Sequence, residues 1–223
     1  VQITGAGRTD TSVNAINYIA HFEIPSELSP ARDFQAEQLC YKLNAMLPRE
    51  IAVHEISEVS EDFHARFDSV GKTYIYRIRN VKEMDIFQRN YCYQITDPLD
   101  VAAMQKAASY IEGTHDFACF QAAGGEERET TVRTVFQLKV ERVGSEVYII
   151  ITGDGFLYNM ARAMAGTVVY AAEGKIRPEE IGAILEAGNR TAAGPTVPPG
   201  GLYMTHLWYD DGIENFECVP MIR

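Results

Sequence analysis

Residues 132–152 read VRTVFQLKVERVGSEVYIIIT, and this stretch decides the fold class. It contains two runs rich in β-branched residues, separated by Gly144-Ser145. Two such runs around a short glycine-containing turn are typical of a β-hairpin, so we expect paired strands over 132–143 and 146–152. A hairpin of two long strands indicates a substantially antiparallel sheet and disfavours a doubly wound parallel one.

The segments on either side of the hairpin alternate between strand-like and helix-like patterns. We expect strands at 1–4, 16–24, 51–59, 72–79 and 202–209, helices at 29–47, 97–113, 156–173 and 178–187, and one long loop at 188–201. Ser29-Pro30 suits the start of the first helix, and Asp97 the cap of the second. The mixture predicts an α+β fold with a mixed, largely antiparallel central sheet and helices packed on it, in two halves, 1–95 and 96–223.

Composition describes an ordinary globular chain. It has 223 residues, of which 46% are hydrophobic, and no run approaches the roughly 20 apolar residues that span a bilayer, so we expect a soluble protein with no membrane contact. The net charge of −11 argues against a nucleic-acid partner when taken alone. The balance inverts between Asp62 and Lys82, however, where Arg66, Lys72, Arg77, Arg79 and Lys82 face two acidic residues. This stripe is either a local site for phosphates or a solvated face.

Cysteine and histidine spacing gives no sign of a metal site. The cysteines are far apart, without a C-x-x-C pair, and no two histidines have the H-x-x-x-H spacing, so we expect no metal. The same cysteine pattern gives no disulfide framework and favours the reducing cytoplasm. Because Val1 is not a methionine and is already strand-like, we expect the chain to begin inside a domain.

The glycine turn GAGRTD at residues 5–10 is the first candidate site. It follows a strand, but Asp10 occupies the third glycine position of a dinucleotide fingerprint, so a Rossmann site is excluded. No P-loop or G-x-S-x-G motif occurs either. What remains is Asp10 two residues after Arg8, which fits a catalytic carboxylate with a cation beside it, or a turn residue with a surface ion pair.

Two further clusters contain side chains that could bind a substrate or take part in a reaction. Tyr74 and Tyr76 share one face of a strand that also carries Lys72 and Arg77, which suits base stacking with phosphate neutralisation, or ordinary sheet packing. Arg162 lies early in a mostly apolar helix, where burial requires an anionic partner. Asp10 would be such a partner; alternatively, Arg162 extends to the surface.

These clusters, taken in order along the chain, resemble the TruA family of tRNA pseudouridine synthases. The matching motifs are GRTD (7–10), AHF (20–22), FHARF (63–67), KTYIYR (72–77), HDF (115–117), VR (132–133), the glycine-bounded helix 155–166 and GLY (201–203). The resemblance implies the pseudouridine synthase fold, with two related halves around a central cleft. It also implies tRNA as substrate, with uridines of the anticodon stem-loop isomerised, and a homodimer in which one tRNA spans both subunits.

Residue roles carried over from the resemblance are specific. Asp10 corresponds to the catalytic aspartate, Arg8 lies beside it, and Arg162 is the basic partner of the carboxylate. Tyr74 is the active-site tyrosine that stacks on the target base, and Arg66 lies near the flipped nucleotide. No cofactor is expected, because the isomerisation involves no net redox change and loses no atom.

The sequence also departs from the family pattern. Thr11-Ser12 stands where Ala-Gly is usual, so a positive φ at residue 12 would be strained. Asn14 replaces a histidine, Tyr158-Asn159 replaces a histidine pair, and the family's amino-terminal strand and helix are absent. These departures leave two alternatives open: a truncated or degenerate homologue that binds tRNA without catalysis, and a nucleoside hydrolase.

Overall fold

The computed structural model describes residues 1–25, 35–125 and 129–209, and its chain divides into two compact units. Unit 1 is Val1–Ala6 with Ile19–Asp68; unit 2 is Gly7–Tyr18 with the residues from Ser69 onward. These boundaries differ from the division expected near residue 95, which stays a prediction about two related halves. Each unit is described by itself.

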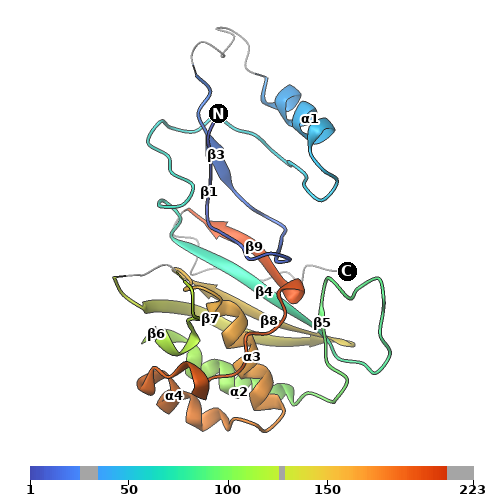
Figure 1. Cartoon of the computed structure of the whole chain (residues 1–223), viewed down its shortest axis with the longest axis vertical. Helices are drawn as coiled ribbons and strands as arrows, with labels where there is room; N and C mark the ends of the chain where they lie inside the picture. The colour runs from blue at the N-terminus through green and yellow to red at the C-terminus, as the bar shows by residue number, and fades with distance from the viewer. Residues whose placement is uncertain (26–34, 126–128, 210–223) are drawn as a thin grey trace. The chain divides into compact units, whose positions relative to one another are not determined.

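Unit 1 contains a two-stranded sheet and one helix. Strand β1 (Ile3–Gly5) pairs antiparallel with β3 (Ala20–Phe22), and α1 spans Ala36–Met46 (Figure 1). Helix α1 ends just before Pro48, as expected, because proline disfavours a helical residue before it. The predicted start at Ser29-Pro30 lies outside the described residues.

Two strand predictions in this part of the chain are wrong. The segment 51–59 forms no strand. The Asn44 side chain donates to the carbonyl of Val53 (2.8 Å) and accepts from its N–H (2.7 Å), which occupies backbone groups that a strand ladder would use. Of the strand expected at 16–24, only Ala20–Phe22 forms a strand, β3 in unit 1, and the separate strand β2 (Asn14–Ala15) of unit 2 precedes the expected segment.

The core of unit 2 is a sheet that confirms the largely antiparallel prediction. Its seven strands, counted among described residues, run in the order β2-β9-β4-β8-β7-β6, with β5 paired to β4. The strands other than β2 are β4 (Gly71–Arg79), β5 (Tyr93–Gln94), β6 (Gly113–Asp116), β7 (Val132–Val143), β8 (Glu146–Gly153) and β9 (Leu202–Trp208). Only the β2–β9 and β4–β5 pairs are parallel within this sheet. The β7–β8 hairpin is confirmed with the expected limits to within one residue.

Three helices lie together on one face of this sheet (Figure 1). They are α2 (Val101–Ile111), α3 (Met160–Ala172) and α4 (Ile181–Ala187), and the short 3-10 turns are η1 (Ala118–Phe120), η2 (Pro178–Glu180), η3 (Arg190–Ala192) and η4 (Pro199–Gly201). The predicted cap of α2 is wrong: Asp100, not Asp97, accepts a hydrogen bond from the N–H of Ala103 at 3.0 Å. Helix α3 begins four residues later than expected, because Asn159 before it has a left-handed backbone. None of the helices in the described ranges combines the length and apolar character needed to cross a membrane.

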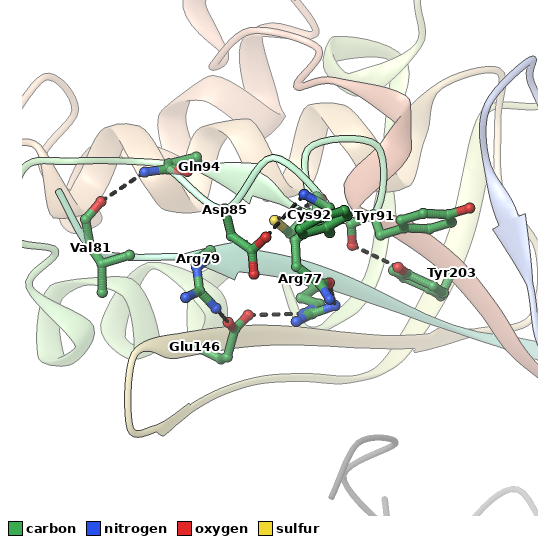
Figure 2. Close-up of polar contacts among 11 residues, drawn as sticks. Arg77, Arg79, Val81, Asp85, Tyr91, Cys92, Gln94, Glu146 and Tyr203 are labelled. Carbon is green, nitrogen blue, oxygen red and sulfur yellow. Dashed lines mark hydrogen bonds and ion pairs between the residues drawn. The ribbon is translucent and has the colours of Figure 1, made fainter. Parts of the chain in front are cut away.

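A partly buried ion network fixes the end of β4 to β8 (Figure 2). Glu146 accepts from Nε of Arg77 and from Nη1 of Arg79, both at 2.9 Å, and Arg77 also donates to Gln88. Burial acts to lower the pKa of Arg77, but the hydrogen bond and charge of Glu146 outweigh it, so this pKa lies above its ordinary value. Two residues of the basic stripe are therefore structural rather than free to bind phosphates.

We expect Glu146→Ala to lower the free energy of unfolding by about 3 kcal/mol, because it leaves the buried Arg77 guanidinium without its anion and removes the partner of the partly exposed Arg79. The matched control is Glu179→Ala, which breaks an exposed ion pair with Lys106 and is expected to change stability little. Urea denaturation of both variants makes the comparison. Equal, small losses would show that the partly buried network contributes no more than a surface pair.

Candidate active site

Asp10 lies in a short turn of unit 2, where its carbonyl accepts from the N–H of Val13 at 3.1 Å. Its side chain accepts a hydrogen bond from Nη1 of Arg162, with 2.9 Å between the nitrogen and Oδ2. The Asp10 and Arg162 side chains are 28% and 14% exposed, so the pair is partly sheltered from solvent. The structure thus brings together Asp10 and Arg162, which are 152 residues apart in the sequence.

Three acceptors hold the guanidinium of Arg162. Nη1 donates to Asp10 and also to Oδ1 of Asn159 at 2.7 Å, and Nε donates to the carbonyl of Val197 at 2.7 Å. The planar fork of arginine is suited to such a set, since it offers several donors in fixed directions. The alternative that Arg162 extends freely into solvent is therefore wrong.

Tyr74 is the third predicted residue that the structure places in this region. It lies on β4, is 8% exposed, and packs edge-to-face on Phe156 with 5.0 Å between ring centroids. Burial raises the pKa of Tyr74 well above its ordinary value, and the nearby charges of Tyr18 and Asp10 raise it further. The hydroxyl is therefore protonated at neutral pH and can act as a hydrogen-bond donor.

Two features of the glycine turn had no clear role in the sequence. The hydroxyl of Tyr18 donates to the carbonyl of Gly7, which ties the two ends of the 7–18 segment together. A Cβ placed on Gly7 would lie 3.0 Å from Nζ of Lys72, so glycine leaves room for a cation here. The sequence places Lys72 in the basic stripe and on the strand of Tyr74, and gives no sign that it lies beside the glycine turn.

Ser12 has the strained backbone that the sequence comparison with the family suggested. Its φ is 70°, in the left-handed region that glycine adopts without cost and a serine does not. Asn14, which replaces the histidine usual in the family, has a defined contact in the structure. Its side chain donates from Nδ2 to the carbonyl of Gly200 at 2.9 Å, next to the β2–β9 pairing.

We expect Ser12→Gly to raise the free energy of unfolding by about 0.5–1 kcal/mol, because relief of left-handed strain exceeds the added freedom of the unfolded chain. The matched control is Ser109→Gly, inside α2, which is expected to lower stability by about 0.5 kcal/mol. Thermal or urea denaturation measures both. A loss of stability in the Ser12 variant would contradict the strain argument.

The two remaining predicted residues, Arg8 and Arg66, lie in different units. Arg8 is exposed and belongs to unit 2, in the same segment as Asp10. Arg66 belongs to unit 1, where its guanidinium lies 5.8 Å from the centre of the Phe67 ring. The ring of His64 packs against that of Phe67, and Nδ1 of His21 accepts from the N–H of Ala65, so this motif has a defined local structure.

Asn159, Phe156 and the carbonyl of Val197 contact the predicted site residues, and none of these contacts was expected from the sequence. The one sequence feature that favours such a contact is the spacing of Asn159 and Arg162, because residues three apart at the start of a helix lie on the same face. In the described part of the chain, no group of three or more His, Cys, Asp or Glu side chains is placed to hold a metal ion.

Comparison with known proteins identifies the class. The sequence profile described as tRNA pseudouridine synthase matches residues 107–210. The chain is 41% identical to tRNA pseudouridine synthase A 2 of Clostridium perfringens over 209 residues, which cover 94% of this chain and 83% of that protein. It is 42% identical to tRNA pseudouridine synthase A of Thermoanaerobacter sp. strain X514 over 209 residues, with the same coverage, and 41% identical to that of Bacillus subtilis over 211 residues, covering 95% of this chain and 83% of the relative.

The mixed sheet, its helices and these similarities define an isomerase of the pseudouridine synthase class. Within this class, the chain belongs to the TruA family of tRNA pseudouridine synthases.

Proposed function

We propose that this chain converts uridine to pseudouridine in the anticodon stem-loop of tRNA, with Asp10 as the catalytic carboxylate. The observation that carries the proposal is the ion pair between Asp10 and Arg162, 2.9 Å long and partly sheltered, in a chain 41% identical to a tRNA pseudouridine synthase. A carboxylate with a fixed cationic partner can attack or deprotonate while its charge stays balanced.

The reaction exchanges one glycosidic bond for another. The bond from ribose C1′ to N1 of uracil breaks, the base turns, and C1′ bonds to C5, while C5 releases a proton and N1 gains one. Asp10 would add to C6 or C1′, or remove a proton at C2′. Atoms and electrons balance in each route without a cofactor.

The other residues bind and orient the nucleotide in this proposal. The base must leave its stack before the glycosidic bond can be reached, and the ring of Tyr74 offers it a stacking surface. The protonated Tyr74 hydroxyl can donate a hydrogen bond to the base. Arg8, in the same segment as Asp10, provides a cation for the phosphates beside the flipped nucleotide, and the resemblance to the family supports a contact of Arg66 in unit 1 with the tRNA.

The assembly and location belong to the same proposal. A homodimer in which one tRNA contacts both subunits allows a chain of net charge −11 to bind RNA through locally basic surfaces. Cytoplasmic location is supported by Cys40, Cys92 and Cys119, which are free thiols. Light scattering of the purified protein, alone and with tRNA, tests the dimer.

The test of the activity is single-turnover release of tritium from tRNA that carries uridine labelled at C5. The isomerase releases one label for each uridine converted, and the product contains pseudouridine. A degenerate homologue would bind tRNA and release no label, and a nucleoside hydrolase would give free uracil. Either of those results would overturn the proposed function.

A further inference from the structure

Asn159 occupies a helix-capping position without capping the helix. At the N-cap of α3, an asparagine oxygen ordinarily accepts from a backbone N–H of the first turn. The Asn159 side chain makes no such bond. Its Oδ1 accepts instead from Nη1 of Arg162, the same nitrogen that donates to Asp10. The side chain therefore supports the arginine rather than the helix.

The backbone conformation of Asn159 also indicates a role other than helix capping. Its φ is 60°, and among the described residues only it and Ser12 are non-glycine positions with positive φ. One lies three residues before Arg162 and the other two residues after Asp10. Left-handed backbone is unfavourable for any residue with a Cβ, although asparagine tolerates it better than most, and such positions concentrate at functional sites.

The carbonyl of Val197, which accepts from Nε of Arg162, is fixed on helix α3 through its own loop, residues 194–201. The N–H of Gly194 donates to Oγ1 of Thr167 at 2.8 Å. A Cβ on Gly166 would lie only 1.9 Å from the carbonyl oxygen of Pro195, so helix and loop are in direct backbone contact. The guanidinium thus has a rigid acceptor on one side and Asn159 on another.

The same loop also contacts the segment that carries Asp10. The carbonyl of Gly200 accepts from Nδ2 of Asn14 at 2.9 Å, and Asn14 pairs with Tyr203 of β9. Val13 closes the turn by bonding to the carbonyl of Asp10, and Asn14 is the next residue in the chain. The loop 194–201 therefore bonds to Arg162 through the carbonyl of Val197, and to the segment that carries Asp10 through the carbonyl of Gly200.

We propose that Asn159 and Asn14 are positioning residues for the isomerisation. Asn159 acts through Arg162, and Asn14 acts through the turn that carries Asp10, with the loop 194–201 as their common support. This inference rests on the proposed function, since it takes Asp10 as the reacting group. A misplacement of about 1 Å at a reacting group can cost about 10²-fold in rate, while tRNA binding depends on many other contacts.

The first test compares Asn159→Gly with Asn159→Asp. Glycine accepts the left-handed backbone and removes Oδ1, so the single-turnover rate constant at saturating enzyme should fall about 10- to 100-fold with an unchanged Kd for tRNA. Aspartate keeps an acceptor oxygen and should stay within about threefold of wild type. A glycine variant within about threefold of wild type, or one whose Kd weakens as much as its rate, would overturn the role of Asn159.

The second test compares an Asn14 variant that loses the side-chain donor with one that keeps a donor. Asn14→Leu has a similar size but no donor and should lose about 10-fold in the same rate constant, whereas Asn14→His retains a ring N–H donor and should recover most of it. The control is Asp100→Ala, which removes the cap of α2. It should lower Tm without changing the rate. Rate losses in the Asn14 variants that follow Tm, as a structural role requires, would overturn the proposal for Asn14.

A measurement without turnover separates this inference from the proposed function. The Nε–H of Arg162, identified in nuclear magnetic resonance spectra by its loss in Arg162→Lys, should exchange slowly with solvent because it is bonded to Val197. Exchange should be at least about 10-fold faster in Asn159→Gly. Unchanged exchange would overturn the inference even in an active enzyme. Absence of pseudouridine formation by wild type would overturn the proposed function and with it the role of Asn159 in the isomerisation, whereas exchange that still depends on Asn159 would show that Asn159 holds the Arg162 guanidinium.

Discussion

Asp10→Asn should bind tRNA with wild-type affinity and form no measurable pseudouridine, less than about a thousandth of the wild-type amount in a single turnover. The amide has the shape of the carboxylate and can still accept from Arg162, so the turn keeps its structure. It is a poor nucleophile and base, however, so the covalent or proton-transfer step is lost. Tritium release and filter binding on the same preparation measure the two quantities.

The matched control for this substitution is Asp100→Asn. It makes the same chemical change and the same change in net charge, and asparagine caps a helix as well as aspartate does, so both activity and stability should stay at wild-type values. Turnover by the Asp10 variant at a tenth of the wild-type rate or more would remove Asp10 from the catalytic role.

Arg162→Lys should lower the single-turnover rate constant by about 10²-fold or more although the positive charge is retained. A lysine ammonium is a single point and cannot replace Nε and Nη1, so it cannot serve Asp10, Asn159 and the Val197 carbonyl together. The Kd for tRNA should change little, because the charge remains. The same single-turnover assay, with binding measured separately, distinguishes the two effects.

Arg177→Lys is the control for the arginine substitution. Arg177 is exposed and pairs with Glu180 on the surface, so lysine should replace it with no change in rate. If Arg162→Lys kept wild-type activity, then charge alone would matter at this position and the geometry of the three acceptors would not. That result would also weaken the case for Asn159.

The fold was predictable wherever local pattern and packing agree. The β7–β8 hairpin and strand β4 form as expected, since the β-branched and aromatic runs of β4 and β8 are buried within the sheet and β7 pairs with β8 along most of its length. The segment 51–59 has a similar apolar pattern and is not a strand, and at Val53 the backbone N–H and carbonyl bond to the Asn44 side chain instead of a neighbouring strand. Hydrogen bonds from a side chain in another element are invisible to a local pattern.

The candidate site was likewise predictable in part from the sequence. Resemblance to a family was enough to single out Asp10, Tyr74 and Arg162, and the chemistry of carboxylate and guanidinium made the pair plausible. Asn159 was noted only as a departure from the family. Its role required knowing that its side chain turns away from the helix cap and towards Arg162.

The amino-acid sequence alone determined the α+β class, the central hairpin and the residue types for the chemistry, because periodicity and side-chain chemistry are local properties. The tertiary structure alone decided which of those residues meet. Asp10 and Arg162 are brought together across 152 residues by β2, β9 and the loop 194–201, and Ser12 and Asn159 adopt unfavourable backbone angles beside them. Such contacts depend on long-range packing, which fixes distances and directions that no local pattern specifies.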